Sequence, residues 1–113
     1  MHELALTQSV IDLVSARARQ EGLRCVTRVT IEIGALVAVD PAAMRFCFEA
    51  VVEDTAAAGA ELVIVSIPLR ARCRRCSCEH APETLISPCP QCGSGVREWL
   101  AGREARVRSF EGE

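Results

Sequence analysis

The segment from residue 70 to residue 97 limits the possible folds of this chain more than any other part. It is rich in Cys, Arg, Pro, Gly and Ser, and its cysteines follow the spacing C-x2-C-x12-C-x2-C: Cys73, Cys76, Cys89 and Cys92. With so few aliphatic side chains, such a segment cannot bury a core that offsets its loss of conformational entropy. Four thiolates can surround Zn²⁺ tetrahedrally at about 2.3 Å, and metal binding then supplies folding free energy. We therefore predict a zinc site here.

The nature of this metal site leaves alternatives open. Four sulfur ligands leave no position for water or substrate, which favours a structural zinc ion over a catalytic one. Iron of the rubredoxin type accepts the same ligands, although little apolar cover is available for a redox centre. Cys78 and His80 lie beside the pairs. They are either exposed loop residues or ligands that exchange into the metal sphere when pH or redox state changes.

The cysteine count and the lack of targeting signals indicate the cellular compartment. The chain has seven cysteines, an odd number that suits reduced or metal-bound thiols better than a complete set of disulfides. We find no secretory signal and no apolar run of the roughly 20 residues needed to span a membrane. We expect a cytoplasmic protein without a membrane partner. Cys25 and Cys47 lie on apolar faces and are expected to be small buried side chains.

The charge distribution argues against nucleic acid as the main partner. Lys and Arg number 13 against 15 Asp and Glu, for a formal net charge of -2. A short basic patch starts the cysteine segment, with no aromatic residues interleaved for base stacking: Arg70, Arg72, Arg74 and Arg75. A zinc-ribbon module that binds nucleic acid or assists transcription therefore stays the alternative function. A thiol redox enzyme is a third reading, and no other catalytic motif is present.

Two helices are predicted before the cysteine segment. Residues 3–20 place one set of apolar residues on one side of a helical wheel, and Gly22 ends the helix: Leu4, Leu6, Val10, Ile11, Leu13, Val14 and Ala18. Asp40 followed by Pro41 predicts the start of a second helix, which extends to about residue 55. Its apolar face does not include Phe46, which we expect to point elsewhere.

Strands are predicted at residues 24–34, 60–69 and 99–110, the second as a candidate central strand. In the first of these strands, alternation places Val29 and Ile31 on one face of the sheet and Val26 on the other face. The fold class is α+β: a small, mainly antiparallel three-stranded sheet with two helices on one face, plus an inserted zinc-ribbon-like domain. Residues 1–69 and 98–113 form one discontinuous domain, and residues 70–97 form the insert.

The amino terminus offers a second candidate metal site. The α-amine of Met1, the amide nitrogen of His2 and the His2 imidazole can close adjoining chelate rings, and Glu3 can add a further donor. Such a nitrogen-rich, near-planar set suits Ni(II) or Cu(II) better than zinc. The ordinary alternative is that His2 is a surface residue at the start of a helix.

The order of these motifs is familiar. The chain contains "MHELALTQSVIDLV", then "IEIGALVAVDPAAMRFCFEAVVEDT", then "CPQCGS", and finally "LAGREARVRSFE". It resembles the HypA/HybF family of nickel-insertion accessory proteins for [NiFe] hydrogenase maturation, over essentially its whole length. Cys78 is a departure, since it adds a thiol beside the zinc loop.

The resemblance implies a non-enzymatic metallochaperone that carries Ni(II) and holds a structural Zn(II). The implied nickel ligands are Met1, His2 and Glu3. Asp40 is an additional candidate, although its role as a helix cap is enough to explain its presence. Zinc falls on the four paired cysteines: Cys73, Cys76, Cys89 and Cys92. The implied partners are a nickel-handling maturation GTPase and the hydrogenase large-subunit precursor, and urease also receives nickel in some members. We expect a monomer or a weak homodimer.

Overall fold

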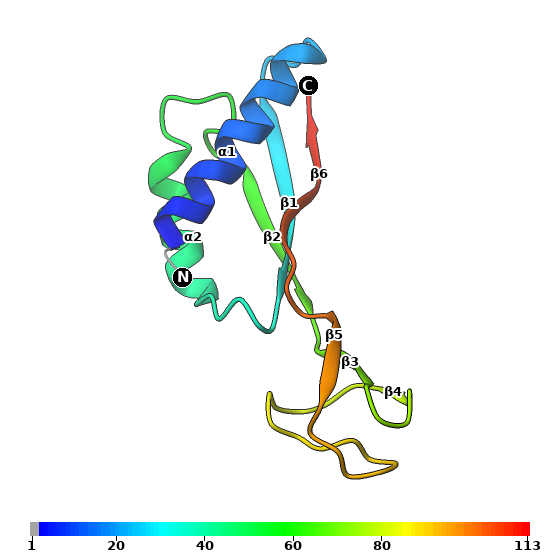
Figure 1. The fold of residues 1–113 in the computed structure, drawn as a ribbon. Coiled ribbons are helices and arrows are strands. Elements are labelled where there is room, and N and C mark those ends of the chain that lie inside the picture. The colour runs from blue at the N-terminus through cyan, green and yellow to red at the C-terminus, as the bar shows by residue number, and fades with distance from the viewer. Residues whose placement is uncertain (1–2) are drawn as a thin grey trace.

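The protein is described by a computed structural model that covers residues 3–113 and is elongated, 54 × 26 × 17 Å. Figure 1 shows a helix-covered sheet at one end and a smaller, loop-rich lobe at the other. The elements in chain order are α1 (Glu3–Gln20), β1 (Val26–Gly34), α2 (Pro41–Val51), β2 (Glu61–Ile67), β3 (Arg70–Cys73), β4 (Glu79–His80), β5 (Arg97–Ala101) and β6 (Ala105–Gly112).

The larger sheet has three strands in the order β2-β1-β6. The predicted α+β class, with two helices packed on this sheet, is confirmed, but the sheet is mixed. β1 pairs in parallel with β2 and antiparallel with β6. The parallel pair arises because α2 carries the chain across between the two strands, as parallel pairing requires. The prediction of a central strand at residues 60–69 is wrong, since β1 is central and β2 lies at an edge.

The core lies between the two helices and β1. The fully buried side chains of greatest volume come from these elements: Phe48, Ile11, Ile31, Met44, Val14, Val26, Val29 and Thr7. Leu4 and Leu13, predicted on the apolar face of α1, lie at its rim and are 57% and 46% exposed. Thr7 takes a core position instead, because its hydroxyl oxygen lies 2.9 Å from the carbonyl oxygens of Glu3 and Leu4 and is satisfied within the helix.

A bulge changes the phase of β1. Alternation predicts Val26 on the side opposite Val29, yet both side chains are buried. The pairing with β6 shifts register between Val26 and Arg28, so the strand gains one residue there. An extra residue reverses the alternation locally, which places Val26 on the core side.

The second helix begins as predicted and ends earlier. Asp40 is its N-cap and Pro41 its first residue, while the helix stops at Val51 instead of near residue 55. The chain beyond it enters turns in which Asp54 has a φ of 62°. Phe46 points away from the core, as expected, and is 75% exposed.

The smaller lobe contains the second sheet, with antiparallel strands in the order β4-β3-β5. A single strand was predicted for residues 99–110, but Gly102 divides it into β5 and β6. β5 pairs with β3, so residues 98–101 belong to the small sheet and not to the sheet of β1. The physical reason is the φ of 120° at Gly102, which turns the chain from one sheet to the other.

The two sheets meet where backbone segments approach very closely. The N–H of Gly34 donates to the carbonyl of Glu104, and the N–H of Leu36 donates to the carbonyl of Gly102, both at 2.7 Å. Leu69, at the start of the small lobe, is buried against Gly102. Both bonds attach the end of β1 and the residues after it to the segment that links β5 with β6. Among residues 3–113, no helix is long and apolar enough to cross a membrane.

Candidate metal centre

The first cysteine pair lies in a tight turn that follows β3. The N–H of Cys73 donates to the carbonyl of Cys78, and the N–H of Ser77 donates back to the carbonyl of Cys73, both at 2.9 Å. The turn requires a left-handed residue, and Ser77 has a φ of 64°. The N–H of Arg75 also points at the Cys73 sulfur, at 3.4 Å. The turn therefore aims backbone dipoles at the thiolate position.

The second pair repeats this turn at the same offsets. The N–H of Cys89 donates to the carbonyl of Ser94 at 2.9 Å, and the N–H of Gly93 donates to the carbonyl of Cys89 at 2.8 Å. Gly93 occupies the left-handed position, with a φ of 78°. Ser77 and Gly93 are thus equivalent, although sequence reasoning identified neither as part of the site. The position four residues after the first cysteine of each pair was the available signal.

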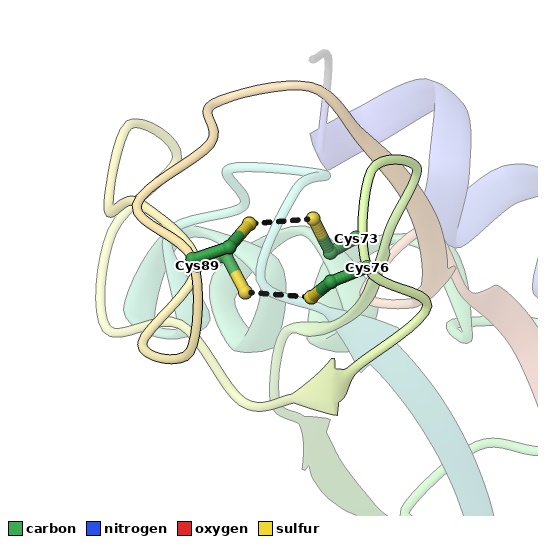
Figure 2. Close-up of side chains that lie close together, drawn as sticks. Cys73, Cys76 and Cys89 are labelled. Atoms are coloured by element: carbon green, nitrogen blue, oxygen red, sulfur yellow. Dashed lines mark hydrogen bonds between the residues drawn. The ribbon is translucent and has the colours of Figure 1, made fainter.

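The two turns face each other and bring the four thiols together. Figure 2 shows Cys73, Cys76 and Cys89, with dashed lines between sulfurs of opposite turns. The Sγ atoms of Cys73 and Cys92 are 3.5 Å apart, those of Cys76 and Cys89 are 3.6 Å apart, and all four lie within 4.8 Å of one another. Four sulfurs placed tetrahedrally at about 2.3 Å from Zn²⁺ are about 3.8 Å apart. The predicted cluster is formed, and its geometry fits a tetrahedral thiolate site.

The backbone of the turns favours thiolate at two of these cysteines. The pKa of Cys73 is lowered to about 6, chiefly by the N–H of Cys76 and then by that of Arg75, which outweigh burial. The pKa of Cys89 is also lowered, first by the N–H of Cys92. Hydrogen bonds to the charged form favour it, so these two sulfurs are prepared to bind a cation.

Crowding has the opposite effect on Cys76. The N–H of Cys78 lowers the Cys76 pKa, but burial and the three other thiols of the cluster raise it more, to about 12. Several thiolates this close repel one another and cannot all ionise by themselves. A bound cation removes that repulsion, so the donor set is suited to a metal ion and poorly suited to free thiols.

Cys78 and His80 lie beside this cluster and not in open solvent. Both are half-buried, and their ligand atoms lie within 4.8 Å of each other and of the Cys89 sulfur. Sequence reasoning singled out both residues, but their closeness to Cys89 follows only from the pairing of β3 with β4. Cys25 and Cys47 were expected to be buried and are instead half-buried, like Cys78.

Two of the four arginines in the basic patch at the start of the small lobe pair with acidic neighbours. Arg72 lies 3.7 Å from Glu79 and 3.3 Å from Glu98, and Arg70 lies 3.9 Å from Glu79. These side chains are about half exposed, so each pair contributes little to stability. The pairing nonetheless reduces the positive potential that a phosphate backbone would need.

The predicted nickel residues that the structure describes begin the two helices of the larger part of the molecule, whereas the four cysteines lie in the small lobe. Met1 and His2 lie outside the described residues. Glu3 begins α1, and its Oε2 accepts a hydrogen bond of 3.1 Å from the N–H of Asp40. Asp40 caps α2 by accepting from the N–H of Ala42 at 3.0 Å. The structure therefore brings Glu3 and Asp40 together at the helix starts.

Known proteins are similar to this chain in sequence and in fold. The chain matches the family described as "Hydrogenase/urease nickel incorporation, metallochaperone, hypA" over residues 1–112. The chain belongs to this metallochaperone family. It is 43% identical to a hydrogenase maturation factor HypA of Rhodopseudomonas palustris (strain BisA53) over 98% of each chain. It is also 43% identical to the hydrogenase maturation factor HypA of Geotalea uraniireducens (strain Rf4), over the full length of both proteins.

Two solved structures support the same assignment. The solution structure of the Ni metallochaperone HypA from Helicobacter pylori is 28% identical, with a TM-score of 0.72, covering 99% of this chain and 97% of that one. A second solution structure of a HypA protein is 29% identical, with a TM-score of 0.77, and the match covers 100% of this chain and 97% of that one. The predicted resemblance to the HypA/HybF family is confirmed.

Proposed function

We propose that this chain carries Ni(II) on Met1, His2 and Glu3, with Asp40 as an additional ligand, and delivers it during maturation of [NiFe] hydrogenase. The observation that supports this site is the hydrogen bond between the Glu3 carboxylate and the N–H of Asp40. It fixes the first turn of α1 against the start of α2. One Asp40 oxygen caps the helix, which leaves the other available to a metal beside Glu3.

The four paired cysteines are the proposed ligands of a structural zinc ion. The support is the distance between sulfurs of opposite turns, 3.5 and 3.6 Å, close to the value expected for tetrahedral coordination. Zinc holds the two turns together in a lobe with few buried apolar residues. All four positions are sulfur, so the ion supplies folding free energy and takes no part in catalysis.

The two proposed metal sites assign a role to each part of the chain. Residues 1–69 and 102–113 form the proposed nickel-binding domain, and residues 70–101 form the zinc insert. The pairing of β5 with β3 supports this boundary in place of one at residue 97. The protein acts in the cytoplasm as a carrier and not as an enzyme. Its proposed partners are a nickel-handling maturation GTPase and the hydrogenase large-subunit precursor, with urease as a second destination for the metal.

Nickel exchange at such a site depends on stepwise competition for its ligands. Amine, amide and imidazole nitrogens all bind protons, so nickel affinity falls as the pH falls through the imidazole titration. Copper(II) binds the same donors more tightly in the ordinary affinity order. Selectivity for nickel therefore comes from metal availability and from the docking of partners.

The test is a nickel titration by calorimetry and absorption on the chain beginning with Met1, on the same chain with one extra amino-terminal glycine, and on His2→Ala. We expect one nickel ion per chain, and loss or reshaping of binding in both altered proteins. Equal binding in all three proteins would refute the amino-terminal site.

The role of Asp40 needs a variant that preserves the helix cap. Asp40→Asn keeps a side-chain oxygen for the N–H of Ala42, because Asn caps helices about as well as Asp, but it removes the negative charge. We expect weaker nickel binding with unchanged thermal stability. Asp12→Asn, an exposed change on α1, is the matched control. If Asp40→Asn binds nickel as tightly as Asp12→Asn, Asp40 is only a cap.

A further inference from the structure

A second group of metal-ligating side chains lies against the four-cysteine cluster. Cys78 leaves the first turn, His80 follows in β4, and both have ligand atoms within 4.8 Å of the Cys89 sulfur. Cys89 therefore belongs to two sets: the four paired cysteines, and a group made of Cys78, His80 and Cys89. The pairing of His80 with Ala71 across β3 and β4 fixes this arrangement.

The imidazole of His80 is oriented as a metal ligand would be. Its Nδ1 lies 3.4 Å from the carbonyl oxygen of Cys78, which can only accept, so this contact favours the tautomer with a proton on Nδ1. The lone pair is then on Nε2. Within residues 3–113, His80 Nε2 is buried and has no hydrogen-bond partner. A buried polar atom without a partner costs about 1–3 kcal/mol, and metal-bound histidines commonly hold their second nitrogen in this way.

The charge of the neighbouring cluster favours another cation. Four thiolates around one Zn²⁺ carry a net charge of about -2. A second cation beside Cys89 offsets this excess negative charge.

We propose that Cys78, His80 and Cys89 form a second site for a thiophilic divalent cation such as Zn²⁺ or Cd²⁺, with the Cys89 thiolate bridging it to the ion in the four-cysteine site. The ligands are two sulfurs and one imidazole nitrogen. Three protein ligands leave one tetrahedral position open to solvent or to an incoming donor, unlike the closed four-cysteine site. The thiol proton of Cys78 passes to solvent when the ion binds.

The test uses cadmium, which reports directly on sulfur ligands. The full chain with one extra amino-terminal glycine, which removes the proposed nickel site, is stripped of metal and titrated with ¹¹³Cd²⁺. We expect two cadmium ions per chain and two ¹¹³Cd resonances with a scalar coupling between them through the bridging sulfur. Cys78→Ser and His80→Ala are each expected to keep the first ion and lose the second. Cys47→Ser, which changes a half-buried thiol on α2, is the control and keeps both.

The inference rests on the zinc part of the proposed function, and the two can fail separately. Absence of any bound cadmium overturns both. One ion only, or one ion whose resonance moves in Cys78→Ser, shows a single site with exchanging ligands and overturns the second site. Two ions without mutual coupling overturn the bridge. If Cys78→Ser does not fold, His80→Ala decides, because it leaves every sulfur in place.

Discussion

The junction between the two sheets gives the sharpest test of the fold, through Gly34→Ala. An added Cβ at Gly34 would lie 2.1 Å from the carbonyl oxygen of Gly102 and 2.7 Å from the nitrogen of Arg103, which are backbone atoms. Cβ contacts below 3.0 Å essentially do not occur, so the strands must separate by about 1 Å. Their separation strains the hydrogen bond from Leu36 to Gly102.

The expected cost is large and can be estimated from two contributions. Overpacking that shifts the backbone costs about 1–3 kcal/mol. Weakening a hydrogen bond whose partners are shielded from solvent adds about 1–3 kcal/mol. We expect Gly34→Ala to lower the free energy of unfolding by about 3 kcal/mol or more, which lowers the Tm by about 12 °C or more for a domain of this size.

The matched control is Gly59→Ala, measured with Gly34→Ala by thermal unfolding of zinc-loaded protein followed by circular dichroism. Gly59 has a φ of 78°, and an added Cβ there meets nothing within 4 Å. Its cost is limited to the left-handed backbone of an alanine, about 1–2 kcal/mol. If Gly34→Ala were no more destabilising than Gly59→Ala, the close approach of the two strands would be incorrect.

Three further predictions concern the cysteine turns and the junction. Ser77→Gly relieves a left-handed serine with a φ of 64° and should stabilise the zinc-loaded protein by about 1 kcal/mol in thermal unfolding; no gain would contradict the turn geometry. Cys73→Ser should release zinc, measured by metal content after dialysis, whereas Cys25→Ser should retain it. The pKa of Glu104 lies below its ordinary value of 4.5, because its own N–H and that of Gly102 donate to the carboxylate. Its stabilising effect is therefore fully present at neutral pH and is lost as the pH falls below 4.5. Glu104→Gln should reduce the change in the urea unfolding midpoint between pH 7 and pH 3. If the midpoint of this variant depends on pH as that of the unchanged protein does, Glu104 does not have this role.

Helix starts and metal-ligand spacing could be read from local sequence, because each depends on neighbouring residues. Asp40 and Pro41 predict the start of α2 since a carboxylate and a fixed φ act on the adjacent turn. The repeated C-x2-C spacing predicts the cluster because each turn forms within six residues. The burial of Val26 was not predictable, since the bulge in β1 depends on its pairing with β6, about 85 residues later.

The sequence by itself therefore determined the family, the two helices and the four-cysteine site, all of which rest on local spacing or on motifs. Only the tertiary structure decided which strand is central, that Gly102 divides the last strand between two sheets, and that Cys78 and His80 share Cys89 with the cluster. The physical reason is common to all three. Each depends on which distant backbone segments pair, and strand pairing is set by the burial and hydrogen bonding of the whole chain and not by any short stretch of it.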